Sequence, residues 1–144
     1  MAIYGVGSKW NEEELKERFF EEGKFILGWN EDSAEDLYSF TSSLKVGDIL
    51  YIKSNAPGSR TIKVKGVGIV TKNLFSCISS GELGSESYKE WESLFVRVRW
   101  VCKETFTIEI PKNQGKLTNI RAATIYEEHL PYVQEQIINA ITKT

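Results

Sequence analysis

Aromatic and polar side chains that could bind a planar ring stand at the ends of predicted strands. Trp10 and Trp29 each follow a strand-like run. A third run closes on Lys53, Ser54 and Asn55. Stacking on an aromatic ring contributes about 1–3 kcal/mol per nucleobase, and the polar groups can hydrogen-bond a base edge or a phosphate. The same residues are also typical of a core lid and of a solvated hairpin turn.

A run of basic residues follows this polar turn. Arg60 stands at its end, and Lys63 and Lys65 alternate along the next predicted strand. These three side chains predict a basic rim beside the turn or, equally, the solvated face of a sheet. Arg97 and Arg99 also alternate and leave the same two alternatives open.

Groups that would support catalysis are scarce in this sequence. His129 is the single histidine and lies beside Glu127 and Glu128, a pattern typical of a surface or half-buried histidine. A lone histidine removes most nucleophile–base pairs and the common zinc sites, and no GxxxxGK[ST] phosphate loop occurs. The acidic pairs at 31–32 and 35–36 fit the negative charge preferred at a helix N-terminus. We therefore expect a protein that binds rather than catalyses, with no cofactor and no metal.

The composition favours one globular domain over residues 1–144. The chain has 41% hydrophobic and 26% charged residues and a formal net charge of −2, and these values argue against disorder. A sequence-independent DNA binder would carry a basic excess, so a nucleic-acid role must depend on a local basic surface or on one bound nucleotide. Cys77 and Cys102 make no disulfide framework, and no apolar run reaches the roughly 20 residues of a membrane span. We expect a soluble cytoplasmic protein without a signal peptide.

Hydrophobic periodicity predicts an α+β fold. Predicted strands span 3–6, 25–29, 48–53, 61–70, 94–102 and 105–110. The first predicted helix spans 11–22, with Asn11 as the N-cap and Gly23 as the stop. A second runs from Asp32 or Ser33 to just before Gly47, and a third spans 124–141. Residues 76–93 are predicted to be a long surface loop. Glycines at 66 and 68 predict a bulge, a bend or a close backbone contact. These elements indicate a small curved mixed barrel of five to six strands flanked by helices.

Several of these segments together resemble the EVE-like branch of the PUA-like superfamily. The resemblance covers about residues 1–110 and is carried by Ile3–Val6, Trp29, Ala34, Leu44–Asp48, Tyr51–Ser54, Gly66–Val70 and Phe95–Trp100. The Gly47-Asp48 turn also has a physical reason, because Gly tolerates positive φ after a helix and Asp can hydrogen-bond the turn backbone. The chain departs from typical EVE members in having Tyr4-Gly5 where a Tyr-Trp pair is expected, and in the extra helix predicted over 11–22.

The resemblance implies a non-enzymatic pocket that takes up a nucleobase, often a modified one, from DNA or RNA. The positions that match the pocket rim are Ser8, Trp10, Trp29, Lys53, Ser54 and Asn55, with Arg121 closing it from the C-terminal side. Two other hypotheses stay open at this point. The first is a binder of a free nucleotide or cyclic nucleotide, which suits the weakly acidic charge better than a long polymer does. The second is a protein-interaction module of a larger defence or regulatory system, with 76–93 as its contact surface.

Overall fold

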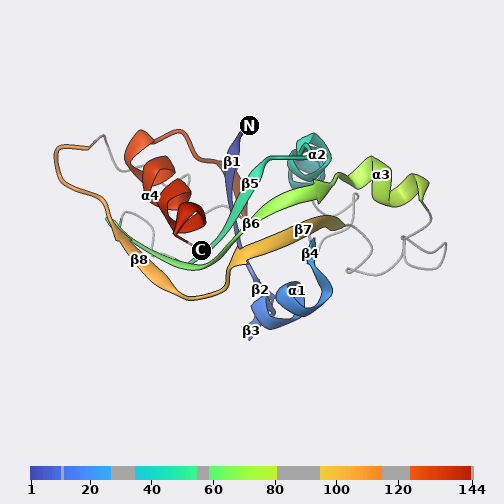
Figure 1. Cartoon of the computed structure of the whole chain (residues 1–144), viewed down its shortest axis with the longest axis horizontal. Helices are drawn as coiled ribbons and strands as arrows, with labels where there is room; N and C mark the ends of the chain where they lie inside the picture. Colours follow the sequence, from blue (N-terminus) through green and yellow to red (C-terminus); the bar gives the residue numbers. More distant parts are fainter. Residues whose placement is uncertain (11, 27–34, 55–58, 81–94, 115–123, 144) are drawn as a thin grey trace.

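The computed structural model describes residues 1–10, 12–26, 35–54, 59–80, 95–114 and 124–143 of the chain. The fold is α+β, with a curled mixed sheet that forms a half-barrel (Figure 1). Its paired strands, in spatial order, are β4 (Lys24–Ile26), β7 (Phe95–Cys102), β6 (Thr61–Lys72), β5 (Ile49–Ser54), β1 (Ile3–Val6) and β9 (Ile125–Glu127), and β8 (Phe106–Glu109) pairs with the first part of β6. The predicted curved sheet is thus confirmed at the level of architecture.

Helices cover the two sides of this sheet. They are α1 (Lys16–Glu22), α2 (Glu35–Ser43), α3 (Leu74–Ser79) and α4 (Pro131–Thr142). One buried cluster includes Phe19 of α1 and Leu74 of α3, and a second includes Val133 and Ile137 of α4. Figure 1 shows α4 beside β8 at one end of the sheet and α3 at the other. Within the described ranges, no helix is long and apolar enough to cross a membrane.

The turn between α2 and β5 behaves as its sequence predicts. Gly47 has φ 95°, a conformation that favours glycine. Asp48 is buried, and its carboxylate accepts hydrogen bonds from the backbone N–H of Lys45 at 2.8 Å and of Ala2 at 3.0 Å. The same side chain therefore ends the turn and ties it to the start of β1, which places β1 beside β5 as a parallel pair.

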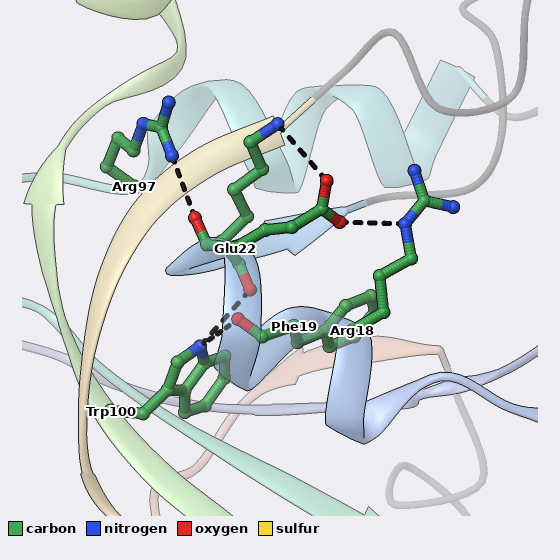
Figure 2. Close-up of polar contacts among 6 residues, drawn as sticks. Arg18, Phe19, Glu22, Arg97 and Trp100 are labelled. Carbon is green, nitrogen blue, oxygen red and sulfur yellow. Dashed lines mark hydrogen bonds and ion pairs between the residues drawn. The ribbon is translucent and has the colours of Figure 1, made fainter.

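The C-terminal end of α1 is fixed to the sheet by side chains of β7 (Figure 2). Gly23 ends the helix in the left-handed conformation, as predicted. Trp100 donates its indole N–H to the carbonyl of Phe19 at 2.9 Å and to that of Lys24 at 3.3 Å. Arg97 donates to the carbonyl of Glu22 at 2.8 Å. The bond from Arg97 satisfies a carbonyl of the last helical residue, which has no intrahelical partner. The three bonds together hold the end of α1 against β7.

Three predicted elements are corrected by the structure. The helix predicted over 11–22 begins only at Lys16, because Lys9–Trp10 (β2) and Glu13–Glu14 (β3) pair as a short antiparallel hairpin. The helix predicted over 124–141 begins at Pro131, because 125–127 pair with β1 as strand β9. The loop predicted over 76–93 starts inside helix α3, and its residues 81–93 lie outside the described part of the chain.

Gly5 in β1 has a steric explanation. A Cβ atom at this position would lie 2.5 Å from the ring of Tyr126 on the neighbouring strand β9. Glycine is therefore required because an aromatic ring lies directly on the backbone.

Candidate functional site

The parallel strands β1 and β5 end at the same edge of the sheet. Their last registered pair is Val6 with Ile52, and Ser8 and Ser54 each follow two residues later. Chain segments that leave adjacent parallel strands at their carboxyl ends are common positions for ligand-binding groups. Three of the predicted site residues therefore lie at these neighbouring strand ends, namely Ser8, Lys53 and Ser54. We call Ser8, Glu14, Lys53, Ser54 and Lys65 the strand-end site.

A β-bulge in β6 delivers Lys65 to this site. Ile52 pairs with Gly66 and Lys53 pairs with Val64, so Lys65 is the extra residue between two registered pairs. A bulge interrupts the alternation of side chains and can redirect one of them. The Lys65 side chain is buried, with 6% of the residue exposed, whereas in a regular strand it would share the solvated face of Lys63.

Glu14 joins Lys65 to Ser8. The Lys65 ammonium lies 2.6 Å from one oxygen of the Glu14 carboxylate. The other oxygen accepts hydrogen bonds from the Ser8 hydroxyl at 2.6 Å and from the Leu15 backbone N–H at 3.1 Å. Burial acts to raise the pKa of Glu14, but the hydrogen bonds from Lys65 and Ser8 outweigh it, so the pKa lies below its ordinary value. Glu14 is therefore held as a partly exposed carboxylate between Lys65 and Ser8.

Lys53 is the second lysine of the strand-end site. Its side chain is half-buried, and its ammonium lies 5.5 Å from the centre of the Tyr126 ring. Burial, together with the charge of Lys65, lowers the pKa of Lys53 to about 8. A lysine with this pKa is partly deprotonated near neutral pH, whereas an exposed lysine is almost fully protonated.

Behind Lys53 lies a buried polar network of two tyrosines and a carboxylate. The hydroxyl of Tyr51 contacts that of Tyr126 at 2.5 Å and donates to Glu128 at 2.7 Å. Glu128 also accepts from the backbone N–H of Leu130 at 3.1 Å, just before α4. Burial, with the adjacent Tyr126, raises the pKa of Tyr51. The network fixes the Tyr126 ring, which forms the inner wall beside Lys53.

The other predicted site residues have different positions. Ser8 is buried, and its hydroxyl is bonded to Glu14, so it supports the site from below. Arg60 donates to the carbonyl of Pro111 at 3.0 Å and thereby holds the start of β6 to the segment after β8. Trp10 has its backbone in β2, but its side chain is not among those described. Trp29, Asn55 and Arg121 lie outside the described residues.

A second basic feature crosses the sheet at the other end of β6. Lys24 on β4, Arg97 on β7 and Lys72 on β6 are registered opposite one another in one row. Lys24 and Arg97 lie 4.2 and 5.4 Å from the centre of the Phe95 ring. Like charges placed opposite one another across strands are unfavourable, and contact with this ring offsets part of that cost.

The site residues that sequence analysis missed depend on contacts distant in the chain. Glu14 carries the signal of a helix first turn, and nothing local indicates its ion pair with Lys65. Tyr126 and Glu128 were assigned to a helix. The sequence does contain one signal for the position of Lys65, because Gly66 directly after it indicates a bulge in the strand.

Lysine and serine side chains at these strand ends are donors that an anion or an electron-rich oxygen can accept from. Within the described ranges, no three His, Cys, Asp or Glu side chains gather as a metal-binding group. His129 is exposed, as predicted, with its ring 3.5 Å from Glu127.

No known protein family and no curated protein sequence matches this chain.

Proposed function

We propose that this protein is a non-enzymatic binding module that takes up a nucleobase of DNA or RNA at the strand-end site. The observation that carries the proposal is that Lys53 and Ser54 close β5 beside the end of β1, with the bulged Lys65 on the paired strand β6. A base edge presents carbonyl oxygens, and its nucleotide presents a phosphate. Both are acceptors for lysine and serine donors.

The electrostatics of the site support a negatively charged or electron-rich ligand. Lys65 is buried and shares its charge with Glu14, while Lys53 loses its proton near pH 8 because it is half-buried next to Lys65. A phosphate beside Lys53 would stabilise its protonated form. Without a ligand, the ammonium charge of Lys53 is destabilised by burial and by Lys65. A bound phosphate would relieve this cost, which would contribute to its binding free energy.

The resemblance to EVE-like domains supports the choice of a nucleobase over other anions. In that resemblance, Trp10, Trp29 and Asn55 are rim positions and Arg121 closes the pocket, and the two tryptophans can stack on a base. The curled mixed sheet agrees with a PUA-like architecture without being specific for it. We also propose a cytoplasmic location, because Cys77 and Cys102 are both buried free thiols.

A free nucleotide is the second candidate ligand. It is favoured by the net charge of −2 and by the carboxylate of Glu14 within the site, because both weaken attraction to a long polyanion. The row of Lys24, Arg97 and Lys72 argues in the opposite direction, since it gives the sheet a local basic surface.

Fluorescence anisotropy at low salt tests the proposal with labelled single-stranded and duplex oligonucleotides, in competition with mononucleotides. We expect Lys53→Ala to weaken binding about 10- to 100-fold, from the about 1.5–3 kcal/mol of a charged hydrogen bond. The matched control is Lys63→Ala, because Lys63 is exposed on the same hairpin, opposite Ser54.

The results separate the candidates. Preferential binding of oligonucleotides that depends on Lys53 supports the proposal. Equal or tighter binding of mononucleotides favours the second candidate. Binding that is unaffected by Lys53→Ala, or absent for every ligand, overturns the strand-end site as a nucleotide site.

A further inference from the structure

We propose that Lys24, Arg97 and Lys72, which we call the basic row, form with the adjacent Arg99 a contact surface for the phosphate backbone of a nucleic acid strand. The choice of a nucleic acid rests on the proposed function, but the surface is separate from the strand-end site. Lys65 and Lys72 are seven positions apart in β6, which is roughly 20 Å along a strand.

Basic and acidic residues are segregated in this fold. The four neighbouring strands β4, β7, β6 and β5 contain seven of the chain's 18 lysines and arginines and none of its 20 aspartates and glutamates. The formal net charge of −2 therefore combines a positively charged sheet with an acidic remainder. A basic patch collected on one part of a protein is the electrostatic feature expected of a nucleic-acid-binding surface.

A second β-bulge in β6 places Lys72 in the basic row. Val70 of β6 pairs with Val98 of β7. Lys72 pairs with the preceding residue of β7, Arg97, so Thr71 is the extra residue of the bulge. In a regular strand Lys72 would lie on the same face as the buried Val70. The bulge instead sets like charges opposite one another, an arrangement that is unfavourable in a sheet and that a bound anion would relieve.

Contacts at the end of α1 orient the other members of the surface (Figure 2). Arg97 donates to the backbone carbonyl of Glu22 at 2.8 Å. The Glu22 carboxylate lies 3.9 Å from the Lys24 ammonium and 2.7 Å from Arg18. Three basic side chains thus surround Glu22, which brings one carboxylate. Arg99 lies two residues after Arg97 on the same face of β7 and is exposed.

The length of the basic row matches a short run of phosphates. Neighbouring strands lie about 4.8 Å apart, so the row spans about 10 Å from β4 to β6. One strand of B-DNA carries a phosphate charge about every 3.4 Å along its axis, so about three consecutive phosphates correspond to this length. Arg99 adds a fourth positive charge about 7 Å along β7. We therefore expect three or four phosphate contacts.

The test measures, by fluorescence anisotropy, the binding of a labelled abasic oligonucleotide, which has the sugar–phosphate backbone but no base. The association constant is followed as the salt concentration rises. Each contacted phosphate of a single strand contributes about −0.7 to the slope of log K against log salt, so we expect a slope of about −2 to −3. A slope flatter than about −1, or no binding at about 50 mM salt, overturns the proposal.

Lys72→Gln and Arg99→Gln each remove one charge from the surface, and Lys112→Gln is the matched control. Lys72 is half-buried and donates to the Ser80 hydroxyl at 2.7 Å. Lys112 is exposed and follows β8, which pairs with the other end of β6. Each surface variant should reduce the magnitude of the slope by about 0.7 and weaken binding about fivefold at 0.1 M salt. Lys112→Gln should change neither quantity, and an equal effect of all three variants contradicts the inference.

Comparison of abasic and base-bearing oligonucleotides separates this surface from base uptake. If base uptake fails, the two oligonucleotides bind equally, while Lys72→Gln and Arg99→Gln still weaken both. If the backbone surface fails, these variants leave the binding of both oligonucleotides unchanged. Vesicles of phosphatidylserine and phosphatidylcholine present a different polyanion. Binding to these vesicles that depends on Lys72 and Arg99, without binding to the abasic oligonucleotide, also overturns the proposal.

Discussion

Replacement of Glu14 by glutamine isolates the ion pair that anchors the strand-end site. Glu14→Gln keeps an oxygen that can accept from Ser8 but removes the charge 2.6 Å from Lys65. Removal of one partner from a fully buried pair costs about 3–5 kcal/mol. Lys65 is buried but the Glu14 side chain is 30% exposed, so solvent screening reduces the expected loss to about 2 kcal/mol.

Urea unfolding followed by circular dichroism measures this loss at pH 7. The pKa of Glu14 is lowered in the folded protein, so its contribution to stability is present above the pKa of the unfolded chain and is lost as pH falls through the folded value. The difference in unfolding free energy between wild type and Glu14→Gln should therefore shrink below about pH 4.

The matched control for this experiment is Glu13→Gln. Glu13 is exposed and pairs with Trp10 in the same hairpin. We expect it to change stability by less than about 0.5 kcal/mol. The reasoning is refuted if Glu14→Gln costs no more than Glu13→Gln at pH 7, or if the cost of Glu14→Gln persists undiminished at low pH.

Three further predictions concern neighbouring parts of the fold. Gly5→Ala should destabilise by more than about 2 kcal/mol in thermal or urea unfolding, because its Cβ would lie 2.5 Å from the Tyr126 ring; unchanged stability would show that the ring moves freely. Asp48→Ala should cost about 2–3 kcal/mol in the same assay, since it leaves two backbone N–H groups without their acceptor, and a loss below about 0.5 kcal/mol would contradict this role. Affinity for a nucleotide phosphate should fall as pH rises through about 8, where Lys53 loses its proton; anisotropy titrations from pH 6 to 9 that show a constant dissociation constant would argue against contact with Lys53.

Local sequence signals predicted the parts of the fold that local physics determines. Gly23 and Gly47 end α1 and the turn after α2 in left-handed conformations, as expected for residues without a Cβ. Asp48 binds the turn backbone, as its side chain length and its position after Gly47 predict. The strand predicted over 94–102 is confirmed as β7.

The errors arose where distant contacts override local preference. The acidic run before Leu15 has the composition of a helix first turn, but Glu14 is bound to Lys65 of β6, and the hairpin forms instead. Residues 125–127 are too few to show a strand pattern beside the longer helical pattern that follows them. They form a strand because they hydrogen-bond to the free edge of β1. For the site, Lys53 and Ser54 were identifiable as a polar strand end, whereas the Tyr51–Tyr126–Glu128 network joins residues 75 and 77 positions apart.

Strand β9 has a consequence for the nascent chain. β1 lies between β5 and β9, so one of its two edges stays unpaired until residues 125–127 have been synthesised. An exposed strand edge is a template for pairing with other chains, and contacts that close such long loops form slowly. The interval before β9 docks is therefore the period in which this protein is most exposed to aggregation, and variants that weaken β9 should reduce soluble yield more than their equilibrium stability implies.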